Sequence, residues 1–146
     1  MIKEIKLLRE FIQNELYFPQ NNLPKKELTI HSYPDKKKKL IVQVCTTNNE
    51  ISKGLMFRKD TLNDDEGMLF CMKSRDKHSF WMKNTYIPLD MIFIDYNGKI
   101  AGIIKNVEPH SLNNRSINEP SAYVLEVNAN FCDKHNVKIG DIINNI

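Results

Sequence analysis

A chain of 146 residues has room for one domain and little else, because a chain of this size buries roughly two thirds of its unfolded surface around a single core. Hydrophobic residues at 41% and charged residues at 27% are ordinary for a globular protein and exclude a disordered, collagenous or fibrous chain. The net charge of +3 gives little support for nucleic-acid binding, since the basic residues are scattered apart from a lysine run at 36–39.

Membrane and export segments are not expected either. No stretch approaches the ~20 consecutive apolar residues of a membrane span, and charged residues interrupt the apolar positions of residues 1–20. We therefore expect neither a transmembrane segment nor an intact signal peptide. The three cysteines, Cys45, Cys71 and Cys132, leave at least one thiol unpaired and fit no disulfide framework, which favours reduced thiols.

The first segment of the chain has a helical pattern. Apolar side chains recur at helix-like intervals over residues 2–18, and Pro19 with the polar residues 20–22 ends the pattern. We expect an N-terminal helix and linker over residues 1–26, followed by a single β-rich domain over residues 27–146. The simplest interpretation is a helix packed on the domain. A partner-binding or membrane-surface helix, or a remnant left after processing, is the alternative.

After residue 27 the pattern changes to that of strands. Apolar and polar residues alternate over residues 28–31 and 40–45, which is the period of a β-strand. The intervening residues 34–39, with Pro34 and the lysine run, predict a charged hairpin loop. Thr47 and Glu50 have the spacing of a capping box, which predicts a short helix over residues 48–54.

The clearest local signal is a β-hairpin in the second half. Residues 89–95 and 99–104 flank Asn97 and Gly98, a pair that can take the positive φ angles of a type I′ turn. Apolar residues occupy both parities of the first strand, so we expect it to be covered on both faces. Further strands are predicted at residues 67–73, 80–84, 122–127 and 141–144, with a helical turn at 131–135. These elements predict a mainly β (α+β) fold, a small curled sheet or barrel-like domain with two or three short helices.

Several motifs occur together in a distinctive order. They are Gly54-Leu55-Met56-Phe57-Arg58, Gly67-Met68-Leu69-Phe70, Phe80-Trp81-Met82-Lys83-Asn84-Thr85, Pro88-Leu89-Asp90, Phe93-Ile94-Asp95, Leu125-Glu126-Val127-Asn128-Ala129 and Ile139-Gly140-Asp141. Over residues 27–146 this order resembles the domain of unknown function 192 family (DUF192). The resemblance implies a compact β-rich fold and no assigned reaction. It also implies a periplasmic or cell-envelope location if a signal peptide has been removed; otherwise the expected location is the cytoplasm.

The family usually has glycine where this chain has Asn130. Asparagine is the residue that best tolerates a left-handed backbone after glycine. We therefore expect the turn at Asn130 to be kept.

One patch of the motifs carries unusual polar residues. Asp90 stands in a strand that is expected to be buried, where a carboxylate needs a partner. Arg58 and Lys83 are the possible cationic partners, and Asn84 could donate a further hydrogen bond. The first interpretation is a structural network that fixes the strand register. The second is a ligand pocket in which Arg58 or Lys83 meets an anionic or hydroxylated group beside Trp81.

A second acid and a possible metal site complete the candidates. Glu126 shares a face with Val124, so it is buried if that face is core, and with Asp90 it would make an acid–base couple. Cys132 and His135 are spaced like two metal ligands, but the most obvious second pair, Cys71 and His78, is too widely spaced. We therefore predict no metal, no cofactor and no established catalytic residue.

The leading hypothesis is a non-catalytic binding or accessory domain, possibly of the cell envelope. It would hold a small polar ligand or a protein segment at Arg58, Trp81, Lys83, Asn84, Asp90 and Glu126. The first alternative is a small hydrolase or lyase using Asp90 and Glu126, which a raised carboxyl pKa beside an open cleft would favour. The second is a purely structural partner-binding protein, which predicts a large exposed apolar stripe on the N-terminal helix.

Overall fold

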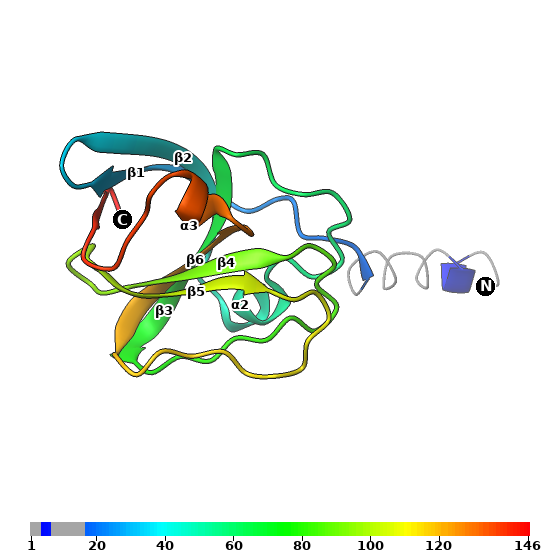
Figure 1. Ribbon diagram of the computed structural model, residues 1–146. Helices are drawn as coiled ribbons and strands as arrows, with labels where there is room; N and C mark the ends of the chain where they lie inside the picture. The colour runs from blue at the N-terminus through cyan, green and yellow to red at the C-terminus, as the bar shows by residue number, and fades with distance from the viewer. Residues whose placement is uncertain (1–3, 7–16) are drawn as a thin grey trace.

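The computed structural model describes residues 4–6 and 17–146 and shows a mainly β fold, as predicted (Figure 1). The strands are β1 (Lys25–Ser32), β2 (Lys36–Cys45), β3 (Glu66–Asp76), β4 (Leu89–Ile94), β5 (Ile100–Val107), β6 (Ser121–Asn128) and β7 (Ile142–Asn144). Two short helices, α2 (Asn48–Lys53) and α3 (Phe131–Lys134), lie between strands. Residues 4–6 are helical, and the rest of the predicted N-terminal helix, apart from its last residues 17–18, falls outside the described residues.

The strands form one curled sheet in the order β5-β4-β6-β3-β2-β1-β7. Only β2 and β3 pair in parallel; the other neighbouring strands in this sheet are antiparallel. The sheet curls so that its two edge strands meet at one end, where Lys99 bridges Ile142 and the Ile143 N–H donates to the Gly98 carbonyl at 2.8 Å. This contact makes the sheet a half-barrel and removes part of its exposed edge.

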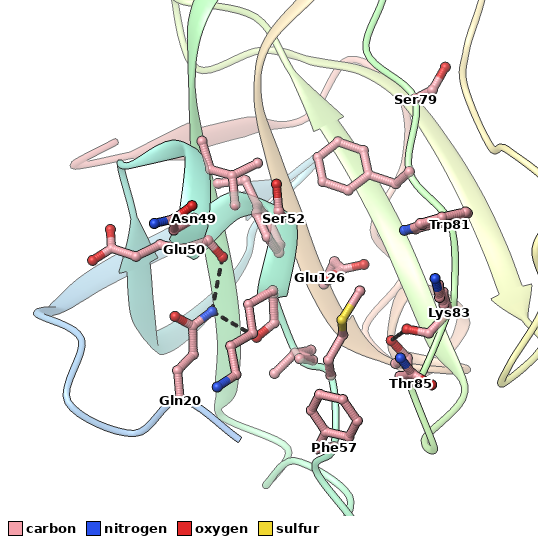
Figure 2. Close-up of a pocket in the computed structure, with 18 of the residues that line it drawn as sticks. Gln20, Asn49, Glu50, Ser52, Phe57, Ser79, Trp81, Lys83, Thr85 and Glu126 are labelled. Carbon is pink, nitrogen blue, oxygen red and sulfur yellow. Dashed lines mark hydrogen bonds between the residues drawn. The ribbon is translucent and has the colours of Figure 1, made fainter. Parts of the chain in front are cut away.

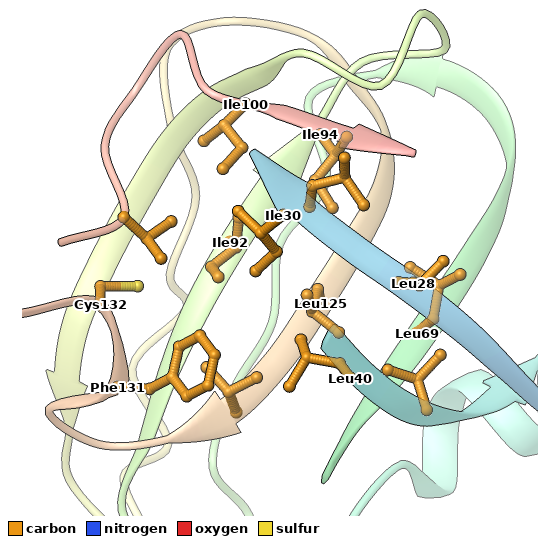
Figure 3. Close-up of a cluster of buried hydrophobic side chains, with 14 residues drawn as sticks. Leu28, Ile30, Leu40, Leu69, Ile92, Ile94, Ile100, Leu125, Phe131 and Cys132 are labelled. Atoms are coloured by element: carbon orange, nitrogen blue, oxygen red, sulfur yellow. The ribbon is translucent and has the colours of Figure 1, made fainter. Parts of the chain in front are cut away.

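The sheet carries a hydrophobic cluster on each face. The inner cluster takes residues from all the strands and from α3, including Leu28, Leu40, Ile92, Leu125 and Phe131 (Figure 3). The outer cluster lies on the opposite face and includes Leu55, Met68, Phe70, Met91 and Phe93. All residues of β4 are buried, with alternate side chains in the two clusters, which confirms that this strand is covered on both faces.

Two predicted elements differ from the structure. The lysines at 36–39 belong to β2, where Lys37 pairs with His31, so the hairpin loop is limited to residues 33–35. Residues 80–84 are not a strand, because only Phe80 forms a bridge, with Arg115, and the backbone turns at Asn84 with φ 53°. Their partners are loop residues, which cannot extend a ladder. The first strand, β1, begins at Lys25.

The hairpin of β4 and β5 is confirmed, but its turn is not type I′. The Gly98 N–H donates to the Asp95 carbonyl at 2.9 Å, and Gly98 alone within residues 95–99 has a positive φ, 84°. This is the three-residue loop in which a turn is followed by a left-handed glycine in a bulge. Asn97 instead accepts a hydrogen bond from the Lys99 N–H through its side chain at 3.0 Å.

Gly98→Val is expected to lower the free energy of unfolding by about 2–4 kcal/mol, because it adds left-handed strain and a steric clash. A Cβ at this position would lie 2.5 Å from the Ile143 carbonyl oxygen in the contact that joins the sheet edges. Gly140→Val is the matched control, since Gly140 also has a positive φ, 95°, but no atom lies within 4 Å of its Cβ position. Urea denaturation of both variants should show the larger loss at Gly98. Equal losses of unfolding free energy in the two variants would mean that the clash at the contact between the sheet edges contributes no extra destabilisation.

Candidate functional site

A cavity with a volume of about 1010 Å³ lies on the outer face of the sheet. Its walls come from residues 49–57, which include most of α2, from residues 79–81 and 83–85 of a loop, and from Tyr17 and Gln20 (Figure 2). Phe70, Met72 and Glu126 close it on the side of β3 and β6. Segments far apart in the sequence therefore meet around one space, as expected of a ligand pocket in a small domain.

The floor of the cavity holds a buried acid. Residues of β6 alternate between the two faces, so Val124 lies in the outer cluster while Leu125 and Val127 lie in the inner one. Glu126 shares the outer face with Val124 and is 5% exposed. Figure 2 shows its side chain among the lining residues. No hydrogen bond or ion pair joins its carboxyl group to any part of the chain that the structure describes.

The electrostatic state of Glu126 follows from this environment. Burial disfavours the charged form and raises the pKa of the Glu126 carboxyl from 4.5 to about 8. Among the described residues, no cation or hydrogen-bond donor pairs with the carboxyl to oppose that effect. The side chain is therefore largely protonated at neutral pH, and a small change in its surroundings can change its charge.

The rim opposite α2 is formed by Trp81 and Lys83. The Lys83 ammonium lies over the Trp81 ring, 5.3 Å from its centroid, which is a cation–π contact. Trp81 is 44% exposed, so one large aromatic side chain stands at the edge of the cavity in contact with solvent. Phe70 and Phe80 add an edge-to-face pair to the wall, with ring centroids 5.1 Å apart.

The backbone is strained where the two walls meet. Phe57 has φ 68° and Asn84 has φ 53°, and the Phe57 N–H donates to the Asn84 carbonyl at 2.8 Å. A positive φ is rare for a bulky residue and costs of order 1–3 kcal/mol, so it persists only where the surroundings hold it. Tyr86 packs edge to face on Phe57, with centroids 6.3 Å apart. Such strain is often found at ligand sites.

The helix that forms the other wall is held by its ends. The predicted capping box is present: the Glu50 N–H donates to the Thr47 hydroxyl, and the Glu50 carboxylate accepts from the Thr47 N–H. Hydrogen bonds from the N–H groups of Thr46 and Thr47 lower the pKa of Glu50. Gln20 donates to the carbonyls of Glu50 and Gly54, each at 2.9 Å. Because the Glu50 carboxylate accepts these N–H groups, its role is to cap the start of α2.

The predicted pairing of Asp90 with Arg58 or Lys83 is wrong. Asp90 is fully buried on the inner face, where its side chain accepts from the backbone N–H groups of Asn106, Asn130 and Cys132 at 2.9, 3.3 and 2.9 Å. These hydrogen bonds connect the end of β5 to the start of α3 through the Asp90 side chain. Asn130 has the expected left-handed conformation, with φ 73°.

Four of the six predicted site residues lie around the cavity: Trp81, Lys83, Asn84 and Glu126. Asp90 lies on the other face, and Arg58 does not line the cavity; its Nε donates to the Asp60 carbonyl at 3.0 Å. The acid–base couple of Asp90 and Glu126 is therefore wrong. Paired strands place Met91 beside Glu126 and Asp90 beside Val127, so the two acids point to opposite faces of the sheet.

No cluster of metal-ligating side chains occurs within residues 4–6 and 17–146. His135 lies 2.9 Å from Asp64, which also forms ion pairs with Lys38 and Lys134, and His78 lies 2.8 Å from the Ser74 carbonyl. All three cysteines are free, and burial raises the pKa of Cys45 to about 12.

In the described part of the chain, no helix has the length and apolar character needed to cross a bilayer.

The fold and the site define a small half-barrel domain with an acid-floored cavity, and comparisons place it in a family. The chain belongs to the DUF192 family, described as "Uncharacterized ACR", which it matches over residues 30–145. Among curated proteins, none matches significantly.

Two solved structures share the fold. One, from Sinorhizobium meliloti 1021 and described as a "putative transcription regulator", is 34% identical with a TM-score of 0.82, over 86% of this chain and 96% of that one. Another, a protein of unknown function from Novosphingobium aromaticivorans, is 30% identical with a TM-score of 0.80, over 90% of this chain and 96% of that one. These comparisons support the fold and family and assign no reaction.

Proposed function

We propose that this chain is a small-molecule binding domain. Its ligand has an apolar body that contacts the aromatic walls and a polar end that reaches Glu126. The observation that carries this proposal is Glu126, a residue that is 5% exposed and whose carboxyl is unpartnered within the described chain at the floor of a cavity of about 1010 Å³. Glu126 lines the cavity, so a donor group of a ligand there would supply the hydrogen bond that the described chain does not.

The contrast with Asp90 supports a ligand role over a structural one. Both acids stand in neighbouring strands of the same sheet, and Asp90 has three backbone donors. A structural acid is normally satisfied in that way. Glu126 faces open volume instead, beside Trp81 and Lys83. Lys83 gives the outer part of the cavity a positive charge, which suits an anionic or hydroxylated group.

The test is a fragment screen by NMR with ¹⁵N-labelled protein. We expect fragments to shift the amide signals of residues 49–57, 79–81 and 83–85, which line the cavity. Glu126→Leu should weaken these fragments by about tenfold or more, because the ligand loses its polar partner. Glu108→Gln is the control, since Glu108 is exposed and not among the cavity residues. Fragments that bind elsewhere, or equally well to Glu126→Leu, would contradict the proposal.

Acid–base catalysis by Glu126 is the second candidate function. The pKa of about 8 favours it, since a proton donor works best with a pKa near the operating pH. It would have to work without Asp90, which faces the other side of the sheet. Turnover of a bound fragment that is lost in Glu126→Gln would establish this function. Binding without turnover would contradict catalysis and support the proposal of a binding domain. The purely structural alternative depends on an apolar stripe over residues 2–18, most of which lie outside the described residues.

A further inference from the structure

We propose that the ligand is an organic zwitterion whose ammonium group pairs with Glu126 and whose anionic group lies at Lys83, with an apolar body against the aromatic walls. This inference rests on the proposed function and names the chemical class that the same cavity takes. It depends on three features: the partnerless acid of the floor, the aromatic lining, and the cation at the rim.

The inner end of the cavity suits an ammonium group. Glu126 lacks a cation in the described chain, and an ammonium group would supply both the opposite charge and N–H donors, whereas a hydroxyl would supply only a hydrogen bond. A ligand carboxylate would find only the single O–H donor of the protonated acid, and no cation among the described residues pairs with Glu126 to offset the ligand's charge. Phe57, Phe70 and Phe80 also line the cavity. The faces of such rings attract cations, as the position of Lys83 over Trp81 already shows in this molecule.

The outer end suits an anion. The Lys83 ammonium forms a cation–π contact and has no carboxylate partner among the described residues. A simple amine would be repelled by this charge as it entered, whereas a ligand that carries an acid at its other end would be attracted. Asn84, which also lines this side, could donate to the same acid group through its side-chain amide. A two-ended ligand therefore fits the distribution of charge better than an amine alone.

Binding of such a ligand has a proton balance that can be measured. Glu126 is largely protonated without ligand, because burial raises its pKa to about 8. An ammonium group lowers that pKa, so the carboxyl loses its proton to solvent as the pair forms. The other ionisable residues described in the cavity lining are Tyr17, Glu50, Lys53 and Lys83, and the Cys45 thiol also interacts with Glu126. The Cys45 thiol has a pKa near 12 and stays protonated at neutral pH.

The experiment uses a matched series of probes: 6-aminohexanoate, hexylamine, hexanoate and hexan-1-ol. We expect 6-aminohexanoate to bind at least about tenfold more tightly than each of the other three. Calorimetry at pH 7 in buffers of different ionisation enthalpy should show release of close to one proton for each 6-aminohexanoate bound. Glu126→Gln, which resembles the protonated acid and should fold normally, is expected to lose this release and at least about tenfold in affinity.

Lys83→Met should remove the preference for 6-aminohexanoate over hexylamine. Lys99→Met, a lysine outside the cavity, should leave it unchanged. Equal or tighter binding of hexanoate or hexan-1-ol would overturn the charge assignment while keeping the ligand site. Failure of the whole series, while a fragment without an amine binds in the cavity, would overturn this inference alone. Failure of every fragment as well would overturn the proposed function with it.

Discussion

The free energy of unfolding is expected to fall as the pH rises from 4.5 to about 8, by about 1.4 kcal/mol per pH unit from Glu126 alone. The unfolded chain loses the Glu126 proton near pH 4.5, whereas the folded chain keeps it until about pH 8. Within this window the folded state binds more protons, so its stability is full below the lower pKa and is lost toward the upper one. The total effect amounts to several kcal/mol, a large share of the stability of an ordinary domain.

Urea denaturation at a series of pH values checks this expectation. In Glu126→Gln the side chain does not titrate, so its stability should vary much less over the same range and exceed that of the natural chain at pH 8. Glu108→Gln, at an exposed position, serves as the control and should retain the decline. Asp64 does not interfere, because its ion pairs and hydrogen bonds lower its pKa and move its effect to strongly acidic pH. A natural chain that is as stable at pH 8 as at pH 5 would contradict the buried state of Glu126.

Asp90→Ala is expected to cost about 3–5 kcal/mol, because it leaves three backbone N–H groups without their acceptor. These donors belong to the end of β5 and to the start of α3, so the loss would loosen both attachments. Asp90→Asn should cost less, since it keeps one acceptor oxygen, but its amide would oppose the Cys132 N–H. Chemical denaturation measures both variants.

A double-mutant cycle with Lys83→Ala separates this explanation from the ion pair that the sequence indicated. Asp90 and Lys83 lie on opposite faces of the sheet and share no contact among the described residues, so the two changes should be additive within about 0.5 kcal/mol. Coupling of ~1 kcal/mol or more would indicate direct pairing and would contradict the observed geometry.

The fold could be predicted where the signals are local. Alternating residues located β1 and the second half of β2, the apolar run before Asn97 and Gly98 located β4, and the Thr47–Glu50 spacing located α2. Each of these signals depends on a few neighbouring residues. The segment at 80–84 has a strand-like composition but forms a loop, since no strand lies beside it to receive its hydrogen bonds. In the turn after β4, the Gly98 carbonyl accepts from the Ile143 N–H of β7, a contact between distant residues that no local pattern contains.

The site could be predicted in part for the same reason. The alternation of β6 placed Glu126 on the buried face of Val124, and the motif around Trp81 and Lys83 proved to line the cavity. The partners of Asp90 are backbone groups brought close by the tertiary fold, so a search for a charged side chain selected the wrong ones. Phe57 and Phe80 lie in the motifs, but the sequence alone does not distinguish an aromatic residue that lines a cavity from one that packs in the core. No sequence pattern marked Gln20 as a residue of the cavity.

The parallel pairing of β2 and β3 has a consequence for how this cavity can change. Parallel neighbours require a connection that crosses from one end of the sheet to the other, and here residues 46–65 form that crossover and carry the α2 wall. The crossover lies outside the strand ladder, so its cavity-facing side chains can vary while every strand keeps its register, provided that Leu55 stays apolar for the outer cluster. Natural selection, or a protein engineer, can therefore change the ligand specificity of the cavity by substituting residues of this one segment. The half-barrel and Glu126 at the floor of the cavity would stay unchanged.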